Sequence, residues 1–401
     1  MSIFREIKDF VRFNKSLYGL FLLFVYTLVI SLNPIHIYFK ALFSILVIFF
    51  LLSKSKVDSL GRLLFMFSLT YGLITIINGL SFSSGETVCY FVAPLAFYLF
   101  GQNVVKSCQG EQQLIILILL CVLALGANVY WSTIIGIIDN GFVNVGRMLA
   151  VSGYGSEEET MNATLLGAAV SFGFAGFATF IFNIKHPFTI ISLLGFAIGC
   201  LSILTVVYLV NRTGLFVAFS VVIITYYWMS KSDTSNLVWI GLGLLAIYVV
   251  VVKTGIVDES IIDAYINRSD TVGNSLEGNS RFDRWSFALQ HVFIDPFGWA
   301  SNSSYQTVYA HNLWLDVARY AGILPFAFLI IATVKAMKQV VCIFKKNNSE
   351  LAALFIGLNI CLFLTCMVEP IMEGSSITFY FSCFIWGCQC QYLMSTSSSN
   401  V

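Results

Sequence analysis

Arginine and histidine residues that could bind a phosphate group occur at three places in the 401-residue sequence. Arg281 and Arg284 lie in Ser-Arg-Phe-Asp-Arg-Trp, His311 precedes Asn312, and Arg212 stands in Asn-Arg-Thr-Gly. An arginine guanidinium presents planar donors that match two phosphate oxygens, and a histidine can exchange a proton near neutral pH. These residue types predict a site for an anionic head group such as a pyrophosphate.

Two chemical roles are open for His311. The helix expected to begin at Asn312 has free N–H groups and a partial positive charge at its N-terminus, which favour a bound phosphate. The same field favours a neutral histidine, the form that a general base requires. A lone histidine is also often a structural hydrogen-bonding group, so position alone does not decide between these roles.

The positions of Arg319 and Arg212 also bear on this site. Arg319 follows His311 by about 12 Å along the same helical face, from a rise of ~1.5 Å per residue, so it could extend the site inward. Arg319 could equally pair with Asp316, three residues earlier on that helix. Arg212 occupies a very short turn beside the bilayer, where an arginine is costly unless it meets an anion or lipid head groups.

An amphipathic helix is expected to follow Ser280, because Ser280 and Asp283 resemble a capping box. At helical spacing, one apolar arc and an adjoining basic arc follow, and such a helix suits the membrane interface. It ends at the turn Asp-Pro-Phe-Gly, residues 295–298. The apolar arc comprises Phe282, Trp285, Leu289, Val292 and Phe293, and the basic arc Arg281, Arg284 and His291.

The elements that position these residues are membrane helices. The chain is 58% hydrophobic and only 11% charged, and its mean hydropathy is +0.84, far outside the range of soluble domains. We expect an all-α polytopic membrane protein of one domain, residues 1–401, with about 12 transmembrane helices and a retained first helix. The expected spans are 16–32, 36–53, 60–80, 84–101, 113–133, 161–183, 188–210, 214–230, 236–253, 312–333, 351–368 and 375–394.

The distribution of lysine and arginine predicts the orientation, because positive residues are retained in cytoplasmic loops. With the N-terminus inside, most of the 22 basic residues are cytoplasmic, both termini are cytoplasmic, and the large loop 254–310 is outside. The outer set is rich in arginine, which suits bidentate phosphate recognition better than lysine does. The outer basic residues are Lys40, Arg147, Arg212, Lys253, Arg268, Arg281, Arg284 and Arg319.

The ten cysteines lie mostly within expected helices, and loop 254–310 has none. A disulfide framework is therefore not expected there, and Cys388 and Cys390 fit helix packing better than a metal site. The sequence has neither a metal-ligand cluster, a phosphate-binding glycine loop nor a nucleophile motif. We expect no cofactor, no metal and no nucleic-acid partner.

The order and placement of these motifs resemble the O-antigen polymerase and O-antigen ligase superfamily. The resemblance rests on Arg212 in a short outer turn, on Arg281 followed by Asp-Pro-Phe-Gly, and on His-Asn-Leu-Trp-Leu-Asp from His311, with Gly322 eleven residues beyond. Each motif is short, but their order on one face of a polytopic chain fits the superfamily along most of its length. It implies a GT-C-like fold in the bacterial inner membrane with a periplasmic active site.

The resemblance implies a metal-independent, inverting glycosyltransferase whose donor is a glycan on undecaprenyl pyrophosphate. Arg212 and Arg281 would clamp the pyrophosphate, and His311 would activate the acceptor hydroxyl or contact the pyrophosphate. Arg284, Asn312 and Arg147 are added as binding candidates. Glu369 and Glu373, beyond the helix expected at 351–368, are alternative bases.

Three functions are compatible with this sequence. A polymerase would join lipid-linked repeat units, with membrane lipids and a chain-length regulator as further partners, and the compact segment from Arg281 to His311 favours it slightly. A ligase would move the finished glycan to lipid A-core. A lipid-linked oligosaccharide flippase belongs to another class, and the scarcity of charge at mid-span disfavours it.

Overall fold

The computed structural model describes residues 15–32, 36–52, 57–80, 83–143, 145, 147–151, 159–183, 188–230, 259–266, 281–302, 309–346, 349–369, 371–374 and 376–398. The chain divides into two compact units. Unit 1 comprises Met1–Ala124, Asn279–Asn347 and Cys366–Val401, and unit 2 comprises Leu125–Gly278 and Asn348–Thr365. The prediction of a single membrane domain over 1–401 stays a prediction.

Seven helical segments in the described part of the chain are long and apolar enough to cross a membrane. Three shorter apolar helices, Leu17–Val29, Ile37–Leu51 and Arg212–Trp228, coincide with expected spans, whereas the expected span 236–253 lies outside the described residues. The chain is therefore an all-α membrane protein in its main architecture, and the count of 12 spans stays a prediction. The seven are Ser59–Ile77, Ser84–Ser107, Glu111–Asn140, Ala163–Phe182, Ile190–Tyr208, Ile323–Lys346 and Glu350–Val368.

The span expected at 312–333 is wrong in its boundaries. A short helix, α14 (Leu313–Ala321), ends before Gly322, and the long apolar helix α15 (Ile323–Lys346) begins after it. Gly322 has φ 78°, a left-handed conformation that interrupts a helix and that glycine adopts at little cost. Hydropathy runs smoothly through this break, which is why the sequence pattern missed it.

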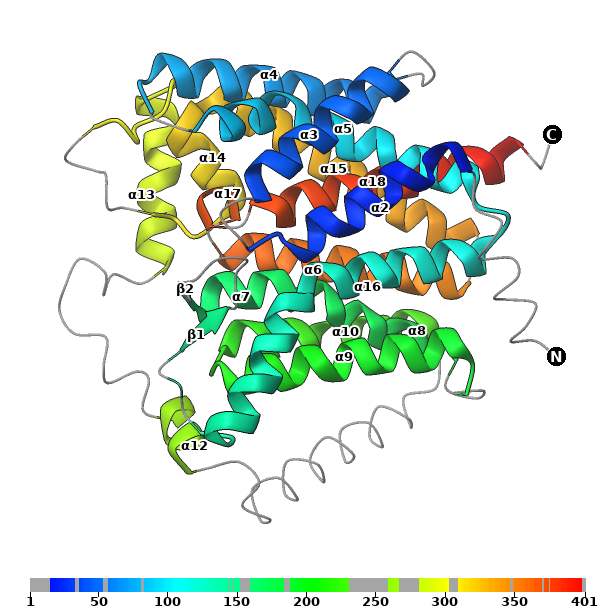
Figure 1. Cartoon of the computed structure of the whole chain (residues 1–401). Helices are drawn as coiled ribbons and strands as arrows, with labels where there is room; N and C mark the ends of the chain where they lie inside the picture. Colours follow the sequence, from blue (N-terminus) through cyan, green and yellow to red (C-terminus); the bar gives the residue numbers. More distant parts are fainter. Residues whose placement is uncertain are drawn as a thin grey trace. The chain divides into compact units, whose positions relative to one another are not determined.

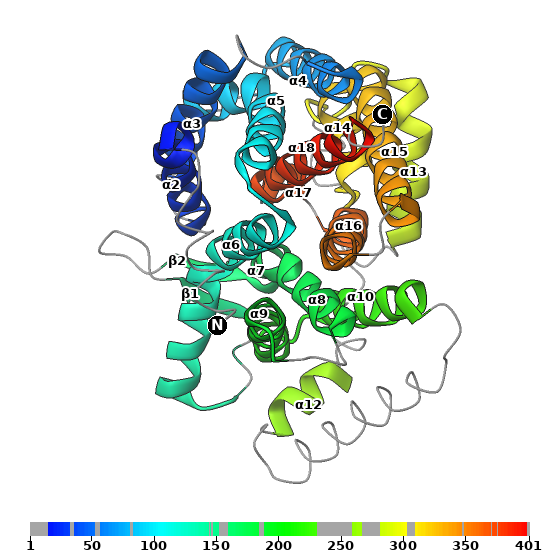
Figure 2. The same ribbon diagram turned by 90° about the vertical axis from the view of Figure 1, so that its right-hand side faces the viewer.

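Unit 1 is a helical bundle whose central pair is α5 (Ser84–Ser107) and α18 (Ser376–Ser398) (Figure 2). These helices approach so closely that a Cβ atom on Gly101 would lie 2.1 Å from the carbonyl oxygen of Phe384. Asp58, the N-cap of α4 (Ser59–Ile77), accepts hydrogen bonds from the Tyr98 hydroxyl at 2.8 Å and the Cys390 thiol at 2.6 Å. Cys390 therefore contributes to helix packing, as predicted. The remaining helices of unit 1 are α2 (Lys15–Val29), α3 (His36–Leu51), α13 (Arg281–Ile294) and α17 (Ile371–Gly374).

Helix α13 runs across the ends of the helices α4, α15 and α18 of the same unit (Figure 1). It lies at the edge of the bundle, beside α14 (Figure 2). Helices α4 and α15 are long and apolar enough to span the membrane, so α13 lies at one end of spanning helices. This is the position expected of an interfacial helix.

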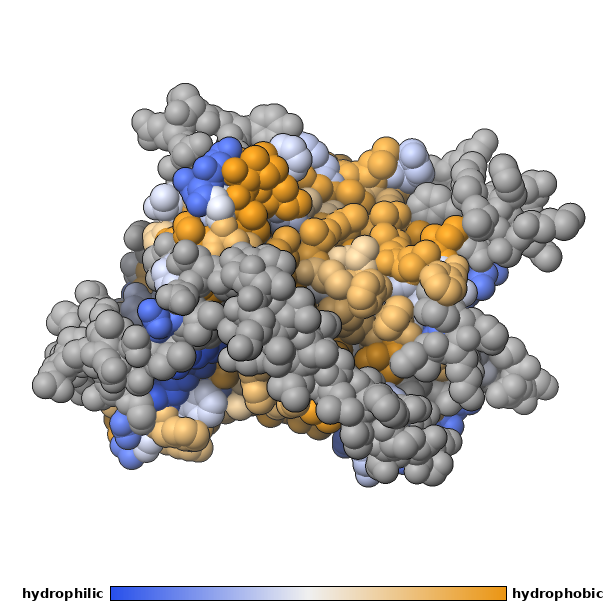
Figure 3. Space-filling model, turned by 90° about the horizontal axis from the view of Figure 1, so that it is seen from below, coloured by the Kyte–Doolittle hydropathy of each residue, from blue (hydrophilic) through white to orange (hydrophobic). Residues whose placement is uncertain are grey.

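In unit 2, the expected span 161–183 is two helices joined by a short 3₁₀ segment. Its small residues permit close packing as predicted, because a Cβ atom on Gly176 would lie 2.1 Å from the carbonyl oxygen of Gly195. On the face drawn in Figure 3, apolar residues gather between hydrophilic residues at its two ends, as a membrane protein requires. The helices of this span are α7 (Ala163–Val170), η1 (Ser171–Ala175) and α8 (Gly176–Phe182), which pack with α9 (Ile190–Tyr208) and α10 (Arg212–Ser230).

A small β-hairpin in unit 2 departs from the all-α expectation. Strands β1 (Met148–Val151) and β2 (Glu159–Asn162) pair antiparallel, with Met148 opposite Asn162. Each strand has four residues, which is too short for an alternating hydrophobic pattern to predict a strand from the sequence. The same unit contains the short helix α12 (Glu259–Ile266), and α6 (Glu111–Asn140) and α16 (Glu350–Val368) contribute residues to both units.

Candidate functional site

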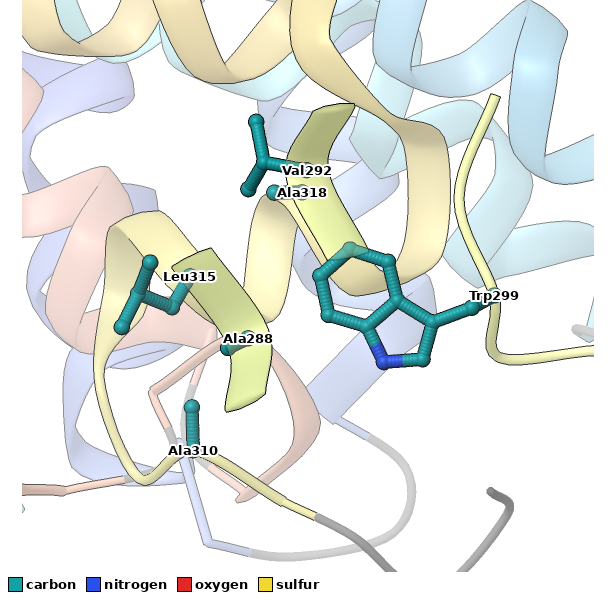
Figure 4. Close-up of a cluster of buried hydrophobic side chains, with 6 residues drawn as sticks. All are labelled: Ala288, Val292, Trp299, Ala310, Leu315 and Ala318. Atoms are coloured by element: carbon teal, nitrogen blue, oxygen red, sulfur yellow. The ribbon is translucent and has the colours of Figure 1, made fainter. Parts of the chain in front are cut away.

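Helices α13 and α14 are joined by a compact apolar cluster (Figure 4). Ala288 and Val292 of α13 pack against Leu315 and Ala318 of α14, together with Trp299 and Ala310. The indole Nε1 of Trp285 donates a hydrogen bond to the carbonyl oxygen of Ala310 at 2.9 Å. Because Ala310 precedes His311, this bond fixes α13 beside the candidate histidine.

The buried stripe of α13 differs from the predicted apolar arc. Trp285, Ala288 and Val292 face α14, whereas other members of the arc point away from the protein. Phe282, Leu289 and Phe293 are 77%, 50% and 75% exposed. The helix begins at Arg281 as predicted, but it has two apolar faces, and only one of them contacts protein.

The Asp-Pro-Phe-Gly turn is held against the break between α14 and α15. The N–H of Ile323 donates to the carbonyl oxygen of Pro296 at 3.0 Å. At Gly322, a Cβ atom would lie 1.9 Å from that same oxygen. These contacts give a structural reason for the spacing of residues 295–298 and Gly322 in the sequence, since any larger residue at 322 would push the turn away.

The backbone around His311 is strained and braced. His311 has φ 51°, a left-handed conformation that is uncommon for residues other than glycine. The carboxylate of Asp316 accepts hydrogen bonds from the N–H of Ala310 at 3.1 Å and of Asn312 at 3.0 Å. Asp316 is fully buried, so its charge is satisfied by the two N–H groups that flank His311.

Asn312 caps α14. Its side-chain oxygen accepts from the N–H of Leu315 at 3.2 Å, as an N-cap residue does. Its amide donates to the carbonyl oxygen of Met367 at 3.3 Å, two residues before the buried Glu369. The alternative base Glu369 therefore belongs to the same unit as His311, whereas the side chain of Glu373 lies outside the described residues.

The charges of two arginines of α13 act on the imidazole of His311. Burial, followed by the charges of Arg284 and Arg281, lowers the pKa of His311 from 6.5 to about 4. The two arginines act through space from the first turn of α13, whereas His311 lies at the N-terminus of α14. His311 is therefore neutral at physiological pH, and its surroundings favour an anion.

Arg319 lies between two tyrosine rings, and its expected role in extending the site stays a prediction. Its guanidinium carbon lies 4.3 Å from the ring centroid of Tyr309 and 5.0 Å from that of Tyr320. The Tyr309 ring in turn lies 6.5 Å from the imidazole of His311. Arg319 is almost fully buried, so it supports the segment that carries His311.

Arg147 and Arg212 belong to unit 2, where two turns converge on one residue. The N–H of Ala163 donates to the carbonyl oxygen of Arg147 at 2.8 Å. The carbonyl oxygen of Ala163 accepts from the Asn211 amide at 2.7 Å, and Arg212 begins α10 directly after Asn211. Ala163 therefore joins the two turns, one through its N–H and the other through its carbonyl oxygen. That Arg147 and Arg212 act together with His311 stays a prediction.

Left-handed backbone conformations occur at two candidate residues, Arg147 and His311, and at Val210, two residues before Arg212. Among the described residues, those other than glycine with positive φ are Arg147 at 65°, Val210 at 50° and His311 at 51°. Such strain concentrates at functional sites, where surrounding contacts maintain it. The sequence contains no signal for this property, because none of the three is glycine, asparagine or aspartate.

The sequence interpretation missed several contributors to the site. Tyr309 belongs to no motif, and Asp316, the last residue of the His-Asn-Leu-Trp-Leu-Asp motif, was not expected to accept hydrogen bonds from the backbone on both sides of His311. His291 was placed on the basic arc, but its hydrogen bond to Asp295, 2.8 Å between Nδ1 and Oδ2, was not foreseen. The four-residue spacing on a helix was the signal that could have indicated it.

Comparison with known proteins finds neither a matching family model nor a curated protein with significant similarity. Within the described ranges, no group of three or more His, Cys, Asp or Glu residues is arranged to hold a metal ion. Similarity to known proteins therefore assigns no function to the chain.

Proposed function

We propose that this protein is an O-antigen polymerase. It joins undecaprenyl-pyrophosphate-linked repeat units at the periplasmic face of the inner membrane, as an inverting, metal-independent glycosyltransferase of GT-C-like fold. The observation that carries the proposal is the position of His311 at the N-terminus of α14, where the charges of Arg281 and Arg284 on α13 act on it. Fixed positive charge beside N–H groups is suited to a pyrophosphate.

In the proposed reaction, the bond between the sugar and the pyrophosphate is already activated. The enzyme must orient the acceptor hydroxyl, remove its proton and stabilise the charge that develops on the leaving pyrophosphate. Arg281, Arg284 and Arg212 carry out the last task, with Arg147 and Asn312 as further binding residues. His311 contacts the pyrophosphate beside the same arginines, because a group with a pKa of about 4 is a weak base at neutral pH.

Deletion of the gene tests the proposal against the ligase alternative. Lipopolysaccharide from the deletion strain is expected to show core carrying a single repeat unit on a gel. A ligase would instead leave wholly unsubstituted core, with long glycan retained on the polyprenyl carrier. That second pattern would replace polymerase by ligase as the function.

Variants test the pyrophosphate clamp. Arg281→Ala, Arg212→Ala and His311→Ala are each expected to abolish chain extension while the protein stays in the membrane. Arg281→Lys is the matched control for charge, because lysine keeps the positive charge but loses the planar fork; it should retain part of the activity. Full activity of Arg281→Ala would remove the clamp from the mechanism.

A further inference from the structure

A second histidine on α13 forms a pair with a carboxylate. The Nδ1 atom of His291 lies 2.8 Å from Oδ2 of Asp295. The imidazole centroid lies 4.1 Å from the ring of Phe287 and 5.6 Å from that of Trp299. The His291 side chain is 12% exposed and that of Asp295 38% exposed, so the aromatic contacts hold the ring and leave a small part of it exposed.

We propose that His291 is the general base for the acceptor hydroxyl, and that Asp295 is its positioning residue. This inference rests on the proposed function and assigns a base that His311 does not supply. A carboxylate that accepts the Nδ1–H of a histidine selects one tautomer and leaves Nε2 as the proton acceptor. It also stabilises the imidazolium that forms when the proton arrives.

The spacing along α13 fits an in-line displacement. His291 is seven residues after Arg284, which is two helical turns and about 10 Å on the same face. An inverting reaction needs the leaving group and the base on opposite sides of the sugar carbon. Three distances of about 3 Å separate the arginine from the base in such a reaction. They are the hydrogen bond from the arginine to the leaving oxygen, the approach of the hydroxyl to the carbon, and the hydrogen bond from the hydroxyl to the base. Their sum is close to the rise between Arg284 and His291.

The His291–Asp295 pair is built on rigid structure. The N–H of Asp295 donates to the carbonyl oxygen of His291 at 2.8 Å, and the N–H of Gly298 donates to that of Asp295 at 2.9 Å. The N–H groups of Trp299 and Ala300 both donate to the carbonyl oxygen of Arg319, at 2.9 and 3.0 Å. The turn that carries Asp295 is therefore fixed to α14, the helix that begins beside His311.

The step conserves atoms and charge. The acceptor hydroxyl gives its proton to Nε2 of His291, and its oxygen forms a bond to the anomeric carbon of the donor. The bond from that carbon to the pyrophosphate oxygen breaks, and its electron pair leaves with undecaprenyl pyrophosphate beside Arg281 and Arg284. The imidazolium of His291 then loses its proton to solvent.

The test uses the full chain in lipid nanodiscs with a lipid-linked oligosaccharide as substrate and undecaprenyl pyrophosphate as the binding probe. His291→Ala is expected to lower kcat by roughly 10²–10⁴-fold, the contribution typical of general bases, with the affinity for the probe unchanged. Added imidazole should restore part of the rate. Asp295→Asn should lower kcat without changing probe affinity, whereas Gln290→Ala, an exposed neighbour on α13, should behave like the wild type.

Two results would overturn the assignment of His291. One is a His291→Ala variant whose kcat stays within twofold of the wild type. The other is a variant that loses probe affinity together with rate and is not rescued by imidazole, because that pattern indicates a structural role. A wild-type protein that binds the probe but transfers no glycan would contradict the proposed function itself, which distinguishes the two failures.

Discussion

His311 has a left-handed backbone conformation, φ 51°, which costs an ordinary residue about 1–2 kcal/mol. The cost is offset by hydrogen bonds from Ala310 and Asn312 to the buried carboxylate of Asp316. The result is an imidazole aimed from a fixed backbone rather than from a flexible loop. Fixed orientation is what a ligand for a pyrophosphate requires, because binding then orders few additional groups.

The protonation of His311 predicts how stability depends on pH. Its folded pKa of about 4 is below its ordinary value of 6.5, so the unfolded chain binds this proton first as the pH falls. The contribution of His311 to stability is therefore complete above pH 6.5 and is lost between about pH 6.5 and 4. Thermal unfolding of the purified protein between pH 7 and 4 measures this effect.

The His311→Gln variant is the control for that measurement. Glutamine does not titrate in this range, so the fall in Tm from pH 7 to 4 should be smaller in the variant than in the wild type. An identical pH dependence of the two proteins would mean that His311 does not have a lowered pKa.

Helices α14 and α15 meet at Gly322, where both conformation and space exclude a side chain. Gly322→Ala is expected to destabilise the protein by more than the roughly 1 kcal/mol that positive φ alone costs alanine, because its Cβ would lie 1.9 Å from the carbonyl oxygen of Pro296. The displaced turn should also lower chain extension. Thermal unfolding and the activity assay measure the two effects.

Gly79→Ala is a matched control for the Gly322 variant. Gly79 also has positive φ, 68°, but nothing lies within 4 Å of a Cβ atom placed there. Its loss of stability measures the conformational cost alone, and its activity should stay near that of the wild type. Equal losses in the two variants would show that the contact with Pro296 does not matter.

The exposed face of α13 predicts contact with lipid. Phe282 and Phe293 project away from the protein on a helix that lies across the ends of the spanning helices (Figure 1). A photoreactive benzoylphenylalanine at Phe293 should therefore cross-link to phospholipid several times more than one at Arg281, which is also exposed and lies about 120° away around the helix. Preferential labelling of position 281 would mean that another face of the helix meets the lipid.

At the scale of the whole chain, the distribution of positive charge predicts the topology. Alkaline phosphatase, which is active only outside the cytoplasm, should be active when fused after Asn302 and inactive when fused after Val401. The physical reason is the retention of Lys345, Lys346 and the other inner lysines in the cytoplasm. The reverse pattern would put the proposed site on the wrong side for a periplasmic reaction.

Hydropathy predicted the membrane class and most spans, because a spanning helix needs a long apolar run wherever it packs. The motifs also identified Arg281 and His311, whose groups interact in the structure. The pattern failed at Gly322, since a reversal of φ leaves hydropathy unchanged. It did not indicate that Asp316 accepts hydrogen bonds from the backbone beside His311, because that depends on the left-handed conformation of His311. It could not indicate that the two arginine turns are joined at Ala163, because that depends on a contact between distant segments.

The break at Gly322 has a consequence for the response of this protein to its bilayer. A spanning helix adjusts to a thicker or thinner membrane by tilting. If α14 and α15 were one rod, each change of tilt would raise or lower His311 with it. Because the chain reverses φ at Gly322, α14 and α15 have separate axes, and a tilt of α15 is not carried along one straight rod to His311, whose segment is held by α13 and the 295–298 turn.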